Sequence, residues 1–249
     1  MEKQHIPYIY GRQPVIEAIK SGQPIEKIFL LSGGEREFER EIRDGIKGLN
    51  IDLAYVPREK LNRLVHGNHQ GVVAYINDYS YVTLDKLLHQ IKTKNEPAFL
   101  MMLDQITDVR NFGAISRSAL LGGCHGIIIP SHNSVSVTSD AIKASAGALT
   151  RIAVCKVNSL PEAADHLAQQ GIQLFASGMG NSVLLHQLPL DEACCIVMGS
   201  EKSGVSKALE SRADKIFSIP QNELLDSYNV SVATGIVVYQ TILKRKYNL

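Results

Sequence analysis

No stretch of the 249-residue sequence has the roughly 20 consecutive apolar residues that a membrane-spanning helix needs. The first residues also lack the apolar core of a signal peptide. Cysteine is scarce, and none of the four cysteines forms a C-x-x-C pair; Cys124, Cys155, Cys194 and Cys195 all lie in or beside apolar runs. We therefore expect a cytoplasmic protein whose cysteines are small core residues, not disulfides or metal ligands.

An excess of charge of one sign is also missing. The formal net charge is +1, and residues 1–78 carry eleven basic and eleven acidic side chains. Because nucleic-acid binders often have a basic excess, this balance is mild evidence against that class. Contacts with phosphate would depend on local clusters, of which one is Arg58, Lys60 and Arg63 and the other is the tail 244–246. Each cluster alone is more typical of a solvated helix face.

Several common catalytic and cofactor motifs are absent too. The sequence has no G-x-S-x-G, no H-E-x-x-H and no Walker phosphate loop. The strings LGGCHG and SGMGNS do not have the glycine spacing of a dinucleotide-binding loop. The eight histidines form no cluster with metal-ligand spacing, so we expect no bound metal. These absences argue against dehydrogenases of the Rossmann type, Walker nucleotidases and zinc proteases.

The pattern that is present is an alternation of strands and helices along the whole chain, which predicts an α/β fold with a mostly parallel sheet. Residues 1–78 form a small α/β unit, and 79–97 a more polar connection with one short helix. A second unit, 98–249, begins with the apolar run AFLMML, which suits a central parallel strand. The pattern alone predicts an unknotted, doubly wound sheet.

Three segments of the second unit place polar residues where a strand ends. This is the edge at which open α/β sheets bind ligands. The segments are LDQITDVRNFGAISRSA (103–119), IVMGSEKSGVS (196–206) and FSIPQNELLDSYNVSVATG (217–235).

Each segment also has a purely structural interpretation. Asn111 could cap a helix and Arg117 could be a surface cation. Gly199 could serve an ordinary strand-to-helix turn, although a glycine there also lets the backbone approach a ligand closely. One cap is enough for the last helix, yet three polar side chains stand at its start: Ser227, Asn229 and Ser231. This surplus favours a functional site.

Together and in this order, the three segments resemble the SpoU/TrmH family of RNA 2′-O-ribose methyltransferases. The family pattern has Asn and Arg on the first segment, G-[ST]-E-x-x-G on the second and I-P…S-L-N-V-S-x-A on the third. The matching residues are Asn111 with Arg117, GSEKSG at 199–204, and Ile219–Pro220 with SYNVSVA at 227–233. The likeness covers roughly residues 98–245.

The sequence departs from the family pattern in two places. Tyr228 stands where the family commonly has Leu, and Gln221–Asn222 replaces a segment that commonly contains glycine. Both positions lie near the expected cofactor site. They bear on the shape of the adenine and methionine pockets more than on the reaction.

The resemblance implies a C-terminal domain with a trefoil knot, a pocket for S-adenosylmethionine, no metal and a homodimer. It makes Arg117 the catalytic residue. The residues expected to hold the loops and orient the target ribose are Asn111, Glu201, Ser227 and Asn229. Those expected to bind the cofactor are Gly178, Gly199, Ile219, Tyr228 and Asn229.

The first unit is similar to the small RNA-binding domain of the same family, which has a fold like that of ribosomal proteins L30e and L7Ae. The segments GRQPVIEAIKSG (11–22) and HQGVVA (69–74) carry this likeness. The expected RNA contacts are Arg12, Arg58, Lys60, Arg63, His69 and Gln70. The two-domain arrangement most resembles that of the bacterial enzymes that methylate a guanosine ribose in 23S ribosomal RNA, so such a guanosine is the expected target. Transfer RNA is one alternative, and an inactive RNA-binding assembly factor is another.

Overall fold

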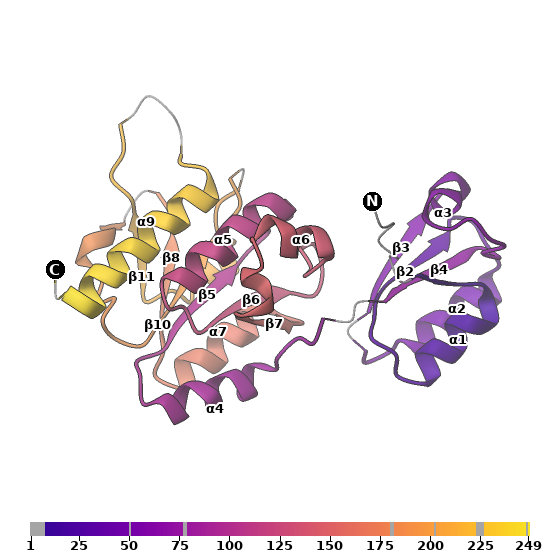
Figure 1. Cartoon of the computed structure of the whole chain (residues 1–249), viewed down its shortest axis with the longest axis horizontal. Coiled ribbons are helices and arrows are strands. Elements are labelled where there is room, and N and C mark those ends of the chain that lie inside the picture. Colours follow the sequence, from indigo (N-terminus) through magenta and orange to yellow (C-terminus); the bar gives the residue numbers. More distant parts are fainter. Residues whose placement is uncertain are drawn as a thin grey trace. The chain divides into compact units, whose positions relative to one another are not determined.

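The computed structural model describes residues 8–49, 51–76, 79–179, 182–201, 203–222, 227–247 and 249. The chain divides into two compact units, unit 1 up to Tyr79 and unit 2 from Ser80 onward (Figure 1). In the part of the chain that is described, no helix is both long and apolar enough to cross a membrane.

Unit 1 is a small mixed sheet with helices on both faces. Its strand order is β1-β4-β2-β3, with β2 and β3 parallel and the other pairs antiparallel. Helices α1 and α2 pack on one face around Ile28, and α3 packs on the other through Leu61. The elements are β1 (Tyr8–Tyr10), α1 (Arg12–Lys20), β2 (Ile25–Leu31), α2 (Arg36–Gly45), β3 (Asp52–Val56), α3 (Arg58–Leu64) and β4 (Val72–Ile76).

Unit 2 is built on a parallel sheet, as the sequence predicts. Over the described residues its strand order is β7-β6-β5-β10-β8-β11-β9, and every neighbouring pair is parallel. The strands are β5 (Phe99–Leu103), β6 (Gly126–Pro130), β7 (Ala153–Val157), β8 (Gln173–Ser177), β9 (Val183–Leu184), β10 (Cys194–Met198) and β11 (Lys215–Ser218). All residues of β5 and β10 are buried, which is typical of central parallel strands.

Helices cover both faces of this sheet (Figure 1). Helices α4 (Leu84–Lys94), α7 (Leu160–Gln169) and α8 (Lys207–Glu210) share one apolar core with it. On the opposite face, α5 (Val109–Leu121) lies beside α6 (Ser139–Ala144) and α9 (Val230–Ile242). The contact between α5 and α9 is close, because a Cβ on Gly122 would lie 2.1 Å from a Val238 methyl.

The segment 79–97, expected to connect the units, contributes to the core of unit 2. Helix α4 begins at a Thr83 cap, whose hydroxyl accepts a hydrogen bond from the Lys86 amide. Its side chains Leu87, Leu88 and Ile91 are buried in the core shared with α7. Only the apolar positions of this mostly polar helix face the protein.

All four cysteines are buried with free thiols, which confirms the prediction that they are core residues. Burial raises the pKa of Cys124 and that of Cys155 to about 12, so neither thiol ionises near neutral pH. Among the described residues, no group of three or more His, Cys, Asp or Glu side chains could hold a metal.

Candidate active site

A cavity of about 280 Å³ lies where three neighbouring strands end. The segments that follow β8, β10 and β11 form most of its wall, and the start of α9 completes it. Since the three strands are parallel, their carboxyl ends share one edge of the sheet, the expected place for a ligand. The apolar part of the lining consists of Met198, Phe217, Ile219, Val230 and Ala233.

Most of the residues predicted to bind the cofactor line this cavity. Gly178, Gly199, Ile219 and Tyr228 all contribute to its wall. The fifth, Asn229, contacts Glu201, which itself lines the cavity.

The loop 199–204 is a tight turn that presents Glu201. Backbone hydrogen bonds between Ser200 and Gly204 close it in both directions, at 3.2 and 2.9 Å. Gly204 has a φ of +66°, a conformation that favours glycine. A Cβ on Gly199 would lie 2.1 Å from the Gly204 backbone, so only glycine fits there.

Two residues directly after β5 hold this loop and the residues that follow it in place. The buried carboxylate of Asp104 accepts a hydrogen bond from the Ser206 amide at 2.7 Å. The side-chain oxygen of Gln105 accepts one from the Ser203 hydroxyl at 3.1 Å. Sequence reasoning missed both residues. The available signal was an acidic residue immediately after a continuous apolar strand.

The structure brings together one residue from each of the three polar segments. The side-chain nitrogens of Asn111 and Asn229 both donate to Oε1 of Glu201, at 3.3 and 2.5 Å. The Asn229 nitrogen also donates to Oδ1 of Asn111 at 3.2 Å. Residues separated by up to 118 positions in the sequence thus form one polar cluster beside the cavity.

Hydrogen bonding fixes the orientation of the Asn229 amide. Its Oδ1 accepts from the Ser231 amide at 2.9 Å and from the Ser231 hydroxyl at 2.6 Å. A backbone N–H can only donate, so the oxygen must point toward α9 and the nitrogen toward Glu201. Asn229 is therefore both the N-cap of α9 and a member of the cluster.

Helix α5 carries Asn111 and Arg117, but it does not place them together. The cap of α5 is Asp108, whose carboxylate accepts from the Arg110 amide, so Asn111 is free for the cluster. Arg117 is six residues further on, about 9 Å along the axis and on another face. It is exposed and has no hydrogen-bond or ion-pair partner among the described residues. Ser227 lines the cavity without joining the cluster.

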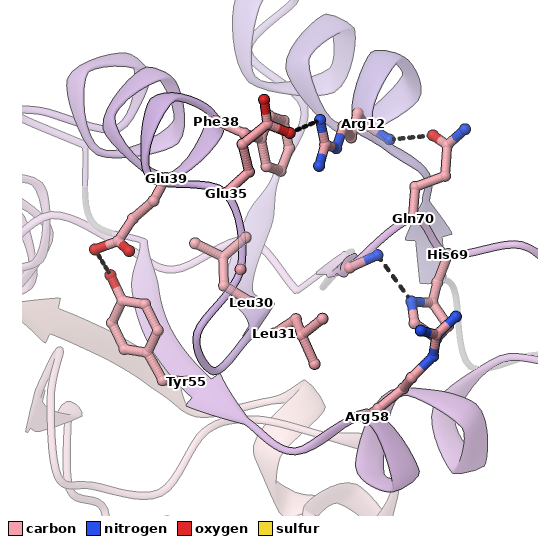
Figure 2. A pocket seen from close by; sticks show the side chains of 12 residues that line it. Arg12, Leu30, Leu31, Glu35, Phe38, Glu39, Tyr55, Arg58, His69 and Gln70 are labelled. Atoms are coloured by element: carbon pink, nitrogen blue, oxygen red, sulfur yellow. Dashed lines mark hydrogen bonds and ion pairs between the residues drawn. The ribbon is translucent and has the colours of Figure 1, made fainter.

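Unit 1 contains a second cavity, of about 430 Å³, at the carboxyl ends of β2 and β3. Four of the residues predicted to contact RNA line it, namely Arg12, Arg58, His69 and Gln70 (Figure 2). Lys60 and Arg63 are exposed on α3 and are not part of its lining.

His69 does not fit the prediction of a direct RNA contact, because it is buried and both ring nitrogens are used. Nδ1 accepts from the Gly71 amide at 3.0 Å, so Nε2 carries the proton and donates to Asn62 at 2.9 Å. Burial, and secondarily the charge of Arg58, lowers the pKa of His69. Its role here is to support the turn that presents Gln70.

In the basic tail 244–246, the guanidinium of Arg245 is engaged within the protein and does not form a solvated face. The Arg245 guanidinium donates to the carbonyls of Leu190, Pro97, Ala98 and Glu192 at 2.6–2.9 Å. It also lies 5.3 Å from the Phe99 ring centroid. Arg245 thus ties the end of the chain to the sheet.

The fold and the site together define a two-unit α/β protein with a ligand cavity at the carboxyl edge of a parallel sheet. Residues 98–239 match the SpoU rRNA methylase family, and residues 8–82 match the RNA 2′-O ribose methyltransferase substrate-binding domain. The first match alone covers more than half of the chain. The chain belongs to the SpoU rRNA methylase family and is an RNA methyltransferase of SpoU/TrmH type.

Similar proteins span nearly the whole chain. A TrmH family tRNA/rRNA methyltransferase of Bacillus subtilis (strain 168), YacO, is 32% identical over 98% of both chains. One from Staphylococcus aureus (strain MSSA476) is 35% identical over 95% of this chain and 96% of its own. Among solved structures, the SpoU methyltransferase AviRb from Streptomyces viridochromogenes, in complex with S-adenosylmethionine, has a TM-score of 0.60 at 20% identity, covering 96% and 90%. This likeness shows the fold.

Proposed function

We propose that this protein transfers a methyl group from S-adenosylmethionine to a ribose 2′-hydroxyl of structured RNA. The observation that carries the proposal is the cluster of Asn111, Glu201 and Asn229 beside the 280 Å³ cavity. Hydroxyl and ribose groups need such a set of fixed donors and acceptors for orientation. The name of the domain family matched by unit 1 refers to the same reaction.

The lining of the cavity suits S-adenosylmethionine. Apolar walls such as Phe217 and Val230 suit the adenine ring, and the hydroxyls of Ser177 and Ser218 suit its ribose. The carboxylate of Glu201 is the charge of the right sign to face a sulfonium. When bound, the cofactor supplies an electrophilic methyl carbon on that sulfonium. The trefoil knot expected around this pocket stays a prediction.

The remaining roles fall to side chains. Asn111, Glu201, Ser227 and Asn229 would hold the loops and orient the ribose. A guanidinium is protonated at any physiological pH, so Arg117 is a poor resting base. We assign it an electrostatic role: it clamps a substrate phosphate or stabilises the developing alkoxide. The proton of the hydroxyl then goes to a phosphate oxygen or to water.

The target that we propose is a guanosine of 23S ribosomal RNA, and the presence of unit 1 supports a large structured substrate. Transfer RNA is the other candidate, because the relatives are named as tRNA/rRNA methyltransferases. Ribose methylation protects the adjacent phosphodiester from alkaline cleavage, so it can be mapped across both RNA classes. Cells lacking the protein should lose one protected position in 23S RNA. Loss of a position in a transfer RNA instead would identify the alternative.

An inactive assembly factor is less consistent with this site. Such a protein has no need to keep Asn111, Glu201 and Asn229 hydrogen-bonded to one another. Calorimetry with S-adenosylmethionine separates the two functions, because an enzyme must bind the cofactor. Absence of binding to the folded protein would favour the assembly factor.

We also propose a homodimer through unit 2. Helix α9 packs on α5, with Val238 against Gly122, but the opposite side of α9 is apolar as well. Val232 and Tyr239, seven residues apart, are 51% and 62% exposed, and Leu121 at the end of α5 is 74% exposed. Large apolar side chains that are exposed on two neighbouring helices indicate a surface that a partner covers.

A further inference from the structure

The cavity of unit 1 combines an apolar floor with a polar rim. Leu30, Leu31 and Phe38 supply the floor, while charged and amide side chains surround it (Figure 2). A phosphate site would be lined mainly by donors. Here two carboxylates, Glu35 and Glu39, share the rim with two guanidinium groups, Arg12 and Arg58, so the rim offers both acceptors and donors. This chemistry suits the plane and the edge of a nucleobase.

Arg12 and Glu35 form a fixed pair on this rim. Nη1 of Arg12 donates to Oε2 of Glu35 at 2.5 Å, and the guanidinium carbon lies 4.8 Å from the Phe38 ring centroid. Contacts on two sides hold the guanidinium in place. Oε1 of Glu35 has no partner among the described residues, so it can still accept a hydrogen bond from a ligand (Figure 2).

Side by side, a guanidinium and a carboxylate offer one donor followed by two acceptors. The Watson–Crick edge of guanine offers the complement, with O6 accepting and N1–H and N2–H₂ donating. Adenine and uracil each have only one donor on that edge, so they match the pair less well. Cytosine has one donor and two acceptors, the same pattern as the Arg12–Glu35 pair, and is therefore not complementary to it. We propose that this cavity holds one unpaired guanine base of the RNA substrate. The proposal rests on the proposed function, because it takes RNA as the substrate.

Other rim residues fit the rest of the nucleotide. Arg58 is exposed and has no ion-pair partner among the described residues, so it can contact a phosphate. Gln70 accepts from the Arg12 amide at 3.0 Å, which leaves its side-chain nitrogen available to donate. The Tyr55 hydroxyl is held by Glu39 at 2.6 Å and by Arg43 at 2.7 Å, so its ring is fixed at the rim for stacking.

The test is the binding of short labelled RNAs to the full-length protein. Fluorescence anisotropy compares three single-stranded heptamers of uridines whose central base is guanine, hypoxanthine or adenine. Guanine should bind about tenfold more tightly than adenine, since the pair discriminates through two or three hydrogen bonds. Hypoxanthine lacks the 2-amino group and should bind with intermediate affinity.

Two matched variants connect this preference to the cavity. Glu35→Gln replaces the two acceptors by one acceptor and one donor, so the preference for guanine should disappear. Glu35 is 55% exposed and its side chain does not cap α2, so this change does not threaten folding. Glu37→Gln removes the same charge from the same helix but outside the cavity, and it should keep the preference.

The proposal is overturned if the wild-type protein binds all three RNAs equally, or if Glu35→Gln keeps the guanine preference. Methyl transfer to ribosomal RNA is measured separately with the same preparations. Transfer without base preference would refute the guanine site alone. A guanine preference that depends on Glu35, without any methyl transfer, would support the site and count against the proposed function.

Discussion

The guanidinium of Arg117 lies on the exposed side of α5 with no partner in the described part of the chain. A cation that no acid of its own chain neutralises is available to an anion in a complex. If that anion is the substrate phosphate or the developing alkoxide, loss of the Arg117 guanidinium should affect the chemical step. We expect Arg117→Ala to slow methyl transfer by about a hundred- to a thousandfold. Affinity for S-adenosylmethionine should hardly change.

Single-turnover kinetics at saturating RNA measure this effect directly. Arg117→Lys should recover little activity, because a point charge does not reproduce the planar, two-pronged contact. Arg110→Ala is the matched control. Arg110 lies seven residues earlier on nearly the same face of α5, but it pairs with Asp108 at 3.1 Å. A rate of Arg117→Ala within a few-fold of the wild type would make Arg117 an ordinary surface cation.

His69 provides a second prediction at this scale, on pH. Its Nδ1 faces the Gly71 N–H at 3.0 Å, so protonation would place two donors against each other. This fits the lowered pKa, whose largest cause is burial. A depressed histidine pKa means that the unfolded chain binds the proton more readily. The contribution of His69 to stability is therefore present above pH 6.5 and is lost as the pH falls below it.

NMR titration of the His69 ring checks both parts of this prediction. The midpoint should lie below 6.5, and the nitrogen shifts should show the proton on Nε2 at neutral pH. A His69 midpoint at or above 6.5 would contradict this account.

At the scale of elements, the last helical segment (Leu243–Tyr247) depends on one side chain. The Arg245 guanidinium donates to carbonyls that precede β5 and β10, those of Pro97, Ala98 and Glu192. Lysine can make fewer of these bonds and cannot stack on Phe99 in the same way. We expect Arg245→Lys to lower the free energy of unfolding by about 2–4 kcal/mol.

Urea denaturation of the full chain measures this loss, and Lys246→Ala is the control. Lys246 is the exposed neighbour of Arg245, so its removal should cost about 0.5 kcal/mol or less. Equal effects of the two substitutions would show that Arg245 does not anchor the segment.

Periodicity predicted the strands and helices better than their arrangement. The apolar runs at β5 and β10 are unambiguous, because buried parallel strands have no polar face. The position of β10 between β5 and β8 is not encoded in any local pattern. Helix α4 looked like part of a connection, because only Leu87, Leu88 and Ile91 of its residues are buried.

The site was predictable as a set of residues and not as a set of contacts. Motif order indicated Asn111, Glu201 and Asn229, but their mutual hydrogen bonds depend on how three loops meet at the sheet edge. The Asp104 carboxylate accepts a hydrogen bond from the amide of Ser206, which is 102 residues away in the sequence. No local sequence pattern indicates such a contact. For the same reason, the sequence could not distinguish the anchoring role of Arg245 from that of a solvated cation.

At the scale of the whole molecule, the two units have separate cores. The 280 Å³ cavity and all the motif residues around it belong to unit 2. A fragment 80–249 should therefore fold and bind S-adenosylmethionine as tightly as the full chain. The fragment must begin before α4, because Leu87 and Ile91 complete its core. Calorimetry decides this, and a folded fragment that gives no binding heat would show that unit 1 contributes to the cavity.

The exposed apolar face of α9 gives the last prediction. Val232 and Tyr239 project from the side of the helix opposite to α5, and exposing them to water in a monomer is unfavourable. The full-length protein should therefore be a dimer at micromolar concentration, as light scattering would show. Tyr239→Asp places a charge in the proposed interface and should shift the protein toward monomers.

Tyr247→Asp makes the same chemical change at a tyrosine that is equally exposed, 63% against 62%, but that lies beyond α9. It should leave the dimer intact. If both variants dissociate equally, the interface extends to the tail, and if the wild type is already a monomer, the apolar face of α9 has another partner.

Because Arg117 lies on α5, directly beside α9, loss of the dimer is also expected to reduce methyl transfer by the Tyr239 variant. A monomeric Tyr239→Asp protein with wild-type activity would mean that each chain carries a complete site.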